Sequence, residues 1–356
     1  MPTITDTPSV IAGQHRSTAL EQAIARDPGA FRILTGDRPT GPLHVGHYFG
    51  TLANRVRLQQ AGVELLVLVA DYQVITDRAT GPALPADVLG LVADYLAAGI
   101  NPDRATIFAH SQVAALNQLL LPFLSLVSVA EISRNPTVKE EMTASGSAAM
   151  SGLMFAYPVH QAADILACRA NLVPVGKDQL PHLELSRVIA RRFNERYSPD
   201  VPFFAEPEAL LSAAPMLLGL DGRKMGKSLG NSVPLRASAD ETARLVARAT
   251  TDSQRRISYD PAGRPEVSSL LLMTALCRDE SPHAVAAEIG DRGAAALKAM
   301  LTTALNERFA AIRSRRAEFA ADDGYLREVL AAGNERARVL ADSTLNSVRR
   351  LMHTSY

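Results

Sequence analysis

Two short segments, far apart in the chain, carry residues suited to binding a polyphosphate. The first, HVGH, spans residues 44–47 and places His44, Gly46 and His47 where a buried run passes into a helical pattern. A helix N-terminus offers N–H groups without partners and a partial positive charge, and a glycine lets a ligand approach the backbone. The spacing by itself fits a phosphate-binding turn, and equally a tight strand-to-helix loop with two surface histidines.

The second segment, KMGKS, spans residues 224–228 and places Lys224 and Lys227 three residues apart on a loop bounded by glycines. Two ammonium groups there suit a leaving polyphosphate, because its negative charge grows as it departs. A lysine pair of this kind is more often a solvated basic loop. We predict that both segments converge on one triphosphate, beside an aromatic cavity marked by a carboxylate.

The run YPVHQAADILAC, residues 157–168, is the candidate for that cavity. Tyr157, Gln161, Asp164 and Cys168 recur at helical spacing and therefore share one face. An indole N–H can only donate, so a tryptophan pocket needs an acceptor, which Asp164 supplies. Such a pocket rejects phenylalanine, because the carboxylate would be left without its partner. The alternative for Asp164 is a helix-surface carboxylate or a buried salt bridge.

Taken in order, these segments resemble the bacterial tryptophanyl-tRNA synthetases, a family of class I aminoacyl-tRNA synthetases. HVGH and KMGKS resemble the HIGH and KMSKS signatures, and YPVHQAADIL and VPVGKDQLPHLELSRVIARRFN are similar to the amino-acid pocket and the helix after it. The resemblance implies activation of L-tryptophan by ATP, with Mg²⁺ accompanying the nucleotide, and then transfer to tRNA(Trp). It also implies a homodimer, with tRNA bridging two subunits.

The resemblance assigns roles to individual residues. Catalysis would involve His44, His47, Lys224 and Lys227. The ATP site would be formed by Arg38, Pro39, Thr40, Gly46, His47, Gly176, Lys177, Asp178, Met216, Lys224, Met225, Gly226, Lys227 and Ser228. The tryptophan site would be formed by Leu34, Tyr157, Gln161, Asp164, Val173, Val175 and Gln179. We predict no protein ligand for a metal, because phosphates and water would hold most of the Mg²⁺ shell.

Four positions depart from the family pattern. KMGKS has Gly226 where serine is usual, and glycine costs more entropy to order, which predicts weaker closure over ATP. HVGH ends in His47 where asparagine is common, Gln161 stands where methionine is expected, and Gln73 stands where histidine is common. These departures suit a divergent second copy, one tolerant of an inhibitor that mimics tryptophan.

The strands and helices that must position these residues alternate along the first part of the chain. FRILTG, VELLVLVA, ATIFAH and LVPV read as buried strands with helices between them, which predicts a doubly wound, parallel, Rossmann-like α/β sheet of the HIGH type. Such sheets bind ligands at the carboxyl ends of their strands. We expect an N-terminal extension over 1–29, a catalytic domain over 30–232, and a helical tRNA-binding domain over 233–356 whose last helix packs back.

Composition narrows the class further. The 356 residues carry zero net charge and two cysteines, which excludes a disulfide scaffold and favours a reducing cytoplasm. The N-terminus lacks the features of a signal peptide. The apolar run at 113–132 contains Asn117, Gln118 and Pro122, which favours a buried helix or a subunit interface over a membrane span. Because the chain is neutral, tRNA must meet a local patch, for which the candidates are Arg308, Arg313, Arg315, Arg316, Arg349 and Arg350.

Other functions stay open. A tyrosine–tRNA ligase also needs a polar partner for the ring oxygen, and Asp164 could serve it. A nucleotidylyltransferase that uses no tRNA can share the HxGH helix start, but the helical C-terminal third argues against it. A non-catalytic paralogue that senses tryptophan would not need both lysines and both histidines. The solvated face of a helix is the alternative reading of the C-terminal arginines.

Overall fold

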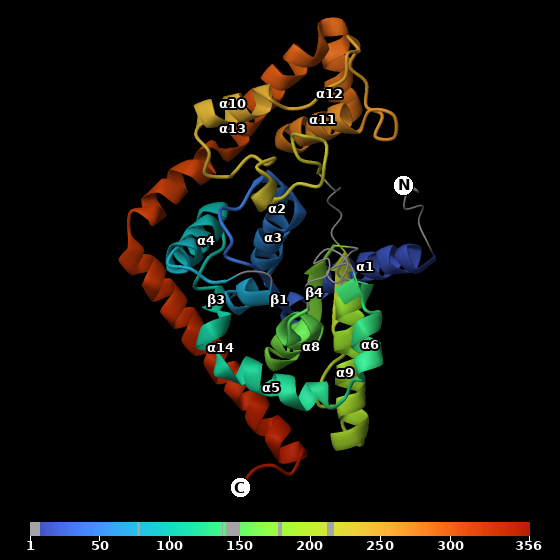
Figure 1. Ribbon diagram of the computed structural model, residues 1–356, viewed down its shortest axis with the longest axis vertical. Helices are drawn as coiled ribbons and strands as arrows, with labels where there is room; N and C mark the ends of the chain where they lie inside the picture. Colours follow the sequence, from blue (N-terminus) through green and yellow to red (C-terminus); the bar gives the residue numbers. More distant parts are fainter. Residues whose placement is uncertain (1–7, 77–78, 137, 140–149, 177–179, 212–216) are drawn as a thin grey trace.

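A parallel five-stranded sheet organises the computed structural model, which describes residues 8–76, 79–136, 138–139, 150–176, 180–211 and 217–356 (Figure 1). Its order is β3-β2-β1-β4-β5. The strands are β1 (Arg32–Asp37), β2 (Glu64–Val69), β3 (Ala105–Ala109), β4 (Leu172–Val175) and β5 (Glu208–Leu211). The order reverses between β1 and β4, and this switch point is where such sheets bind ligands. The predicted doubly wound parallel sheet is confirmed, although β5 was not predicted.

Helices cover both faces of the sheet, because alternate side chains of each strand point to opposite sides. Ile33 and Val67 belong to a core cluster that includes residues of α3 and α4, whereas Leu34 and Leu66 belong to a second cluster with residues of α5, α8 and α9. The helices are α1 (Pro8–Arg26), α2 (Val45–His47), α3 (Ala53–Ala61), α4 (Leu84–Ala98), α5 (Ala114–Leu124), α6 (Val129–Arg134), α8 (Gly152–Ala167), α9 (Leu180–Tyr197), α10 (Ala239–Ala247), α11 (Pro265–Arg278), α12 (Pro282–Ile289), α13 (Gly293–Ala320) and α14 (Asp323–Leu351).

The apolar run at 113–132 forms two helices, α5 and α6, and not the single helix expected. Ser128 begins α6 with a capping box: its backbone N–H donates to Glu131 Oε2 at 2.8 Å, and its Oγ accepts from the Glu131 N–H at 3.2 Å. The apolar residues on either side hid this serine–glutamate signal. Within the described ranges, no helix combines the length and the apolar character needed to cross a bilayer.

Both edges of the sheet are covered by helices from the two ends of the chain. At the outer edge of β3, the Ala109 N–H donates to Asn334 Oδ1 of α14 at 2.8 Å. At the outer edge of β5, the Leu211 N–H donates to Ser17 Oγ of α1 at 3.0 Å. Figure 1 shows α10–α13 gathered at one end of the molecule and α14 running back along the sheet to the other end. The terminal helices thus protect strand edges that would otherwise pair with another chain.

The seating of α14 requires a glycine, and this gives a testable prediction. A Cβ atom at Gly333 would overlap the carbonyl oxygen of Ile107, a backbone atom of β3. We expect Gly333→Val to lower the free energy of unfolding by about 1–3 kcal/mol, the usual cost of overpacking, in urea denaturation. Gly152→Ala at the start of α8 is the matched control, because nothing lies near a Cβ there. Equal stability of the two variants would contradict this seating.

Candidate active site

HVGH and KMGKS lie against each other at the carboxyl end of β1. The segment after KMGKS runs beside HVGH, where the Val45 N–H donates to Val233 O at 3.0 Å and the Leu235 N–H donates to Leu43 O at 2.9 Å. A Cβ atom at Gly46 would lie 2.8 Å from the sulfur of Met225, so the glycine of HVGH makes room for the methionine of KMGKS. The two segments therefore lie together in the fold, although they are about 180 residues apart in the sequence.

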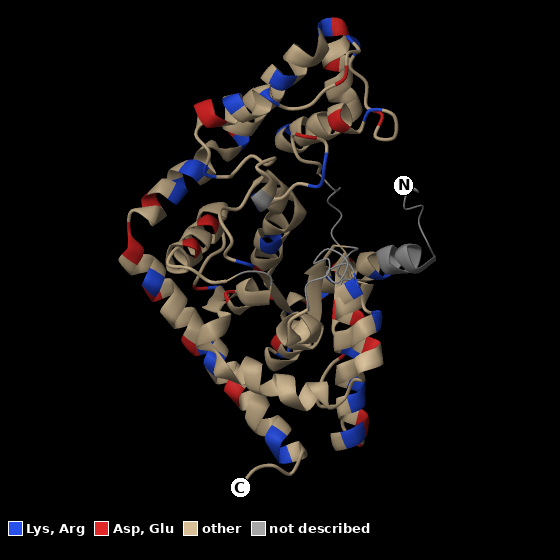
Figure 2. Cartoon of the chain, viewed as in Figure 1, with Lys and Arg blue, Asp and Glu red and all other residues tan. Residues whose placement is uncertain are grey.

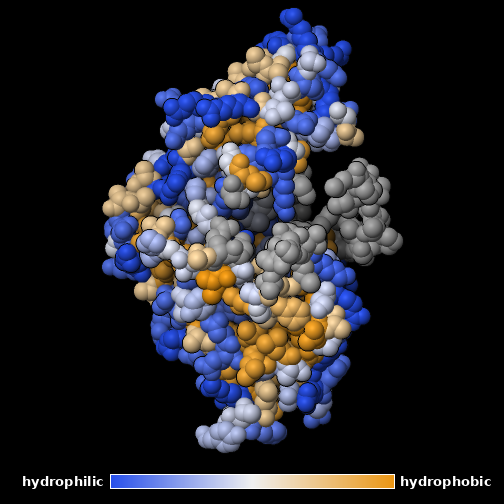
Figure 3. Space-filling view, viewed as in Figure 1, coloured by the Kyte–Doolittle hydropathy of each residue, from blue (hydrophilic) through white to orange (hydrophobic). Residues whose placement is uncertain are grey.

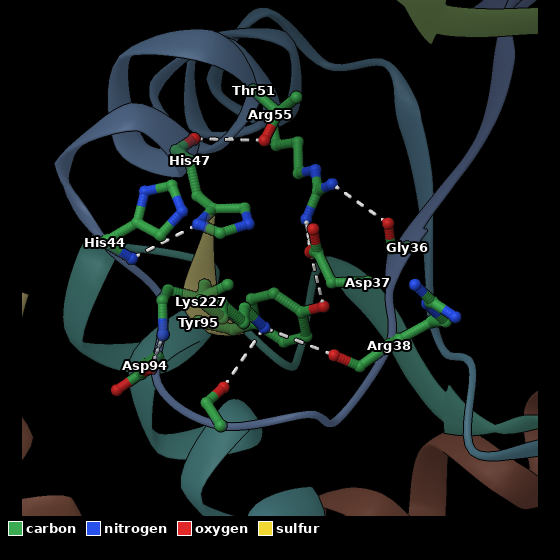
Figure 4. A network of polar contacts seen from close by, with 12 residues as sticks. Gly36, Asp37, Arg38, His44, His47, Thr51, Arg55, Asp94, Tyr95 and Lys227 are labelled. Atoms are coloured by element: carbon green, nitrogen blue, oxygen red, sulfur yellow. Dashed lines mark hydrogen bonds and ion pairs between the residues drawn. The ribbon is translucent and has the colours of Figure 1, made fainter. Parts of the chain in front are cut away.

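The Lys227 ammonium spans the gap between the two segments. Its Nζ donates to Gly41 O at 3.1 Å and to Arg38 O at 3.3 Å, on the turn that follows β1 (Figure 4). Gly41 adopts a left-handed conformation with φ of 110°, which explains a glycine in this turn. Burial lowers the pKa of the Lys227 ammonium. Lys224, in contrast, is exposed, and its carbonyl oxygen accepts from Asn231 Nδ2 at 3.1 Å.

Asn231 shapes the KMGKS loop, and sequence reasoning missed it. Its buried amide donates to Asp221 Oδ1 at 2.8 Å, and its Oδ1 accepts from the Gly226 N–H at 3.0 Å. Gly226 itself has φ of −152°, an extended conformation open to any residue. A Cβ there would meet Leu229 at 3.4 Å, an ordinary contact. The backbone therefore does not require glycine, and a serine would fit.

A buried ion pair lies beneath the two histidines. Arg55 NH1 donates to Asp37 Oδ2 at 2.5 Å, and the Tyr95 hydroxyl donates to the same oxygen at 2.8 Å (Figure 4). Although burial raises the pKa of the Asp37 carboxyl, the Arg55 guanidinium outweighs it and holds that pKa well below its usual range. The sequence offered one signal that was not used, a charged residue, Asp37, at the end of a buried strand.

Both histidines of HVGH are neutral. Burial lowers the pKa of His44 to about 3, and the charge of Lys227, or a proton on His47, would lower this pKa further. Burial also lowers the pKa of His47 to about 4, although Asp37 opposes the change. The backbone N–H of His44 donates to the ring Nδ1 of His47 at 3.2 Å. Because Nδ1 accepts this bond, the proton of the neutral His47 ring lies on Nε2. His47 can therefore donate a hydrogen bond to a phosphate without carrying a charge.

The predicted tryptophan residues gather on the opposite side of β1. Leu34, Val173 and Val175 are buried in the core cluster that receives α8, and Tyr157 packs against the same cluster. Tyr157 Oη lies 2.8 Å from Nε2 of His182, a partner on α9 that was not predicted. Apolar side chains of this kind line the pockets that bind aromatic rings.

Asp164 is buried on α8, with 3 % of its surface exposed. Its Oδ2 accepts from Gln73 Nε2 at 2.9 Å, while its Oδ1 has no hydrogen-bond partner within the described part of the chain. Burial raises the pKa of the Asp164 carboxyl well above its usual value, and the Gln73 hydrogen bond opposes this. Asp164 Oδ1 lies 3.5 Å from His110 Nε2, and this contact would be the buried salt bridge that was the alternative for Asp164 only if His110 were protonated. Burial lowers the pKa of His110 to about 3, which opposes that form.

Comparison with known proteins identifies the family. A family model described as tRNA synthetases class I (W and Y) matches residues 27–310. The chain belongs to this family. The tryptophan–tRNA ligase of Streptococcus agalactiae serotype V is 41 % identical to this synthetase over 337 residues, which is 91 % of this chain and 98 % of that protein. The tryptophan–tRNA ligase of Lactococcus lactis is 40 % identical over 338 residues, with the same shares covered.

Solved structures agree with this membership. The tryptophanyl-tRNA synthetase of Campylobacter jejuni, complexed with ADP and tryptophan, superposes with a TM-score of 0.78 at 27 % identity, over 90 % of this chain and 99 % of that one. The tyrosyl-tRNA synthetase of Archaeoglobus fulgidus, at 23 % identity and a TM-score of 0.64, covers 85 % of this chain and 94 % of that one, and shows the shared fold alone. The predicted enzyme class, an aminoacyl-tRNA synthetase, is confirmed.

Several predicted site residues of the synthetase are not placed. Lys177, Asp178, Gln179 and Met216 lie outside the described residues. The backbone of Ser228 lies in the short helical turn Lys227–Leu229, but its side chain is not described. Gly176 is exposed just after β4. The assignments of these positions to the ATP and tryptophan sites therefore stay predictions.

All six arginines suggested for tRNA binding donate hydrogen bonds within the synthetase itself. Four of these bonds run from Arg308 to Asp279, from Arg313 to Thr242, from Arg349 to Gln118 and from Arg350 to Ser347. The other two arginines join separate helices. Arg315 donates through Nε and NH2 to Ala97 O at 2.9 and 2.7 Å, and Arg316 Nε donates to Asp94 Oδ1 at 2.6 Å. Both contacts join α13 to α4. Figure 2 shows basic and acidic residues interspersed along α13 and α14 in this view. The guanidinium groups of Arg315 and Arg316 therefore stabilise the packing of α13 against α4.

The neutral histidines predict how the stability of the synthetase depends on pH. The folded-state pKa values of His44 and His47 lie below the unfolded value of about 6.5, so their contribution is complete above that pH and is lost as the pH falls towards 4. Each histidine adds a slope of about 1.4 kcal/mol per pH unit in that window. Urea denaturation between pH 7.5 and 5 measures it. His47→Asn is expected to reduce the slope by one histidine, and an unchanged slope would contradict the assignment.

Proposed function

We propose that this class I synthetase is a tryptophan–tRNA ligase, which activates L-tryptophan with ATP and transfers it to tRNA(Trp). The observation that carries the proposal is the buried carboxylate of Asp164, an acceptor on α8, the helix that packs in the same core cluster as Leu34, Val173 and Val175. An indole N–H is the donor that such an acceptor requires. Tryptophan–tRNA ligases that match almost the whole chain at about 41 % identity support the same substrate.

Activation needs no enzyme nucleophile. A carboxylate oxygen of tryptophan attacks the α-phosphorus of ATP, the bond from that phosphorus to the bridging oxygen breaks, and its electron pair leaves with pyrophosphate. The chain contributes position and charge. His47 and the backbone at Gly46 donate to phosphate oxygens, while Lys224 and Lys227 stabilise the departing pyrophosphate. Lys227 then exchanges its contacts with Arg38 O and Gly41 O for contacts with phosphate.

Mg²⁺ enters this reaction as part of the MgATP substrate. The carboxylate nearest to the histidines, Asp37, is occupied by Arg55 and Tyr95 through the same oxygen. The side chains placed at the phosphate site are therefore donors and cations, which suit phosphate better than a hard metal ion. Water and phosphate oxygens complete the shell of the ion.

An exchange assay tests the substrate. ATP–pyrophosphate exchange is measured with each standard amino acid alone, and aminoacylation is then measured with tRNA(Trp). We expect exchange with tryptophan and none with tyrosine or phenylalanine above background. Exchange with tyrosine alone would favour the tyrosine ligase, and exchange with no amino acid, combined with tryptophan binding, would favour a non-catalytic sensor.

The proposal also assigns a role to each part of the chain and places the tRNA-binding surface in the C-terminal part. Residues 30–232 would carry the chemistry, with 1–29 as an extension whose helix α1 covers β5 and 233–356 as the tRNA-binding part. Exposed arginines support the last assignment, because a surface cavity of about 300 Å³ beside α10 is lined by Arg236, Arg244 and Arg248. Phosphates of tRNA are the ligands that such a cluster attracts.

Buried thiols of Cys168 and Cys277 suit the reducing cytoplasm that we propose as the location of this synthetase.

A homodimer is the proposed assembly. Leu121 of α5 is 75 % exposed and Val129 at the start of α6 is 69 % exposed, both within the run predicted as an interface. Figure 3 shows hydrophobic residues gathered over the half of this face where Figure 1 places α5 and α8. Apolar patches of this kind mark subunit contacts. Light scattering of the purified chain gives its mass in solution, and a monomer would contradict the assembly.

A further inference from the structure

A buried aspartate on α4 contacts the turn that joins β1 to HVGH. Asp94 is 2 % exposed and lies in a stretch of α4 that is otherwise buried and apolar in character. Its Oδ2 accepts from the backbone N–H of Leu43 at 2.9 Å, and its Oδ1 accepts from Arg316 Nε at 2.6 Å. A buried carboxylate is costly unless its oxygens have partners, so these two contacts explain why an acid is tolerated there.

Arg316 reaches this carboxylate from α13, 222 residues further along the chain. Its side chain is 15 % exposed, and its NH2 group would lie 3.8 Å from a Cβ atom at Gly90, one turn before Asp94. Burial raises the pKa of Asp94, and the Leu43 N–H and the Arg316 guanidinium oppose this change. The guanidinium therefore lies against α4 and compensates part of the cost of burying the carboxylate.

The turn after β1, residues 38–43, also makes hydrogen bonds with the KMGKS loop and the segment that follows it. Lys227 Nζ donates to two carbonyl oxygens of the turn (Figure 4), and the Leu235 N–H donates to Leu43 O. Under the proposed function, Lys227 exchanges its two contacts for contacts with phosphate. The bond from Leu43 to Asp94 is independent of that loop, because it comes from a helix whose side chains pack in the core.

We propose that Asp94, held by Arg316, is a positioning residue that fixes the turn after β1 in the conformation that receives ATP. The inference rests on the proposed function, because this turn carries Arg38, Pro39 and Thr40 of the predicted ATP site and leads into HVGH. ATP binds where the turn is in place, so its apparent affinity falls in proportion to that fraction of molecules. The pair links the ATP site to α13, a helix of the part proposed to bind tRNA.

Binding of MgATP to the full-length chain tests the inference, measured by calorimetry without an amino acid or tRNA. We expect Asp94→Ala to raise the Kd for ATP by roughly 10-fold, the change that corresponds to losing one hydrogen bond with a charged group. Asp94→Asn should raise it by only about 3-fold, because its amide oxygen still accepts from the Leu43 N–H, about half as strongly as a carboxylate.

A double-mutant cycle shows whether Arg316 acts through Asp94. Arg316→Ala alone should raise the Kd for ATP, but it should have no further effect in the Asp94→Ala background, where the carboxylate that it holds is absent. Asp252→Asn is the matched control, because it breaks another aspartate–arginine pair, 2.7 Å from Arg264 Nε and within the C-terminal part. It should leave the Kd for ATP unchanged.

Steady-state kinetics of ATP–pyrophosphate exchange separate positioning from a loss of stability. Partial unfolding lowers the amount of active enzyme and therefore kcat, without raising KM. In Asp94→Ala we expect the KM for ATP to rise by roughly 10-fold, with kcat and the KM for tryptophan little changed, because the turn is back in place once ATP is bound.

Three results would overturn the inference: an unchanged Kd for ATP in Asp94→Ala, a parallel rise in the KM for tryptophan, or effects of Asp94→Ala and Arg316→Ala that add. If Asp94→Ala fails to fold, Asp94→Asn replaces it, and an unchanged Kd there counts against the inference in the same way. Absence of ATP binding by the wild-type chain would overturn the proposed function together with this inference, whereas the other results leave the proposed function intact.

Discussion

Lys227→Ala is expected to lower kcat for ATP–pyrophosphate exchange by about 10²–10³-fold, the usual loss when one preorganised donor to a developing charge is removed. The ammonium already lies at the junction of the two signatures, 3.1 Å from Gly41 O and 3.3 Å from Arg38 O. It therefore needs only a short movement to reach a phosphate bound at HVGH. Because the pyrophosphate gains charge only as it leaves, the loss should appear mainly in kcat and less in the KM for ATP.

Lys298→Ala is the matched control, because Lys298 is a partly exposed lysine on α13 that donates to Ala247 O. It should leave exchange unchanged. Urea denaturation of Lys227→Ala separates a catalytic loss from unfolding, since the variant also removes two hydrogen bonds to the turn after β1. Unchanged kcat in Lys227→Ala would remove the catalytic role of KMGKS and favour the sensor function.

Asp164→Ala is expected to weaken the preference for tryptophan over phenylalanine by about 10²-fold and to leave the part that comes from shape. A site built to hydrogen-bond a substrate N–H typically rejects the analogue without it by about 10⁴-fold, whereas shape alone gives about 10²-fold. The unpartnered Oδ1 of Asp164 is the acceptor available to the indole, while Gln73 holds the other oxygen. The ratio of kcat/KM for the two amino acids, measured by exchange, should therefore fall by roughly 10²-fold.

Val173→Ala provides the comparison for that result. Val173 is buried on β4 in the core cluster beside α8, and its loss should weaken both amino acids together, because it removes packing and no hydrogen bond. A parallel decline in Asp164→Ala, with discrimination intact, would place the indole acceptor elsewhere.

Local pattern was a sound guide where chemistry and structure depend on neighbours in sequence. Four strands were predicted nearly to the residue, because parallel strands covered on both faces read as apolar runs. β5 was missed, since its sequence EALL is short and begins with a glutamate that pairs with Arg187 and Arg16. The helical end of the chain was predicted for the same reason as the strands, from the period of its apolar residues.

Predictions from local pattern failed in two situations. One is a helix-capping signal inside an apolar run, and the other is a set of contacts between residues that share no spacing in the sequence. The capping box of Ser128 and Glu131 ends the expected single helix and begins α6. The pairing of Asp37 with Arg55 and Tyr95 was also missed, because the three residues come from β1, α3 and α4 and share no spacing in the sequence. Asn231 stood at the end of the KMGKS loop, but its several hydrogen bonds depend on how the loop closes.

The sequence by itself determined the family, the parallel sheet and the two segments proposed to bind phosphate, because short motifs and apolar periodicity can be read along the chain. Only the tertiary structure decided that His47 is neutral, that Asp164 has one oxygen without a partner, and that His110 and His160 lie beside it. Protonation and ligand geometry depend on burial and on distances between elements far apart in sequence. Those quantities arise when the chain folds.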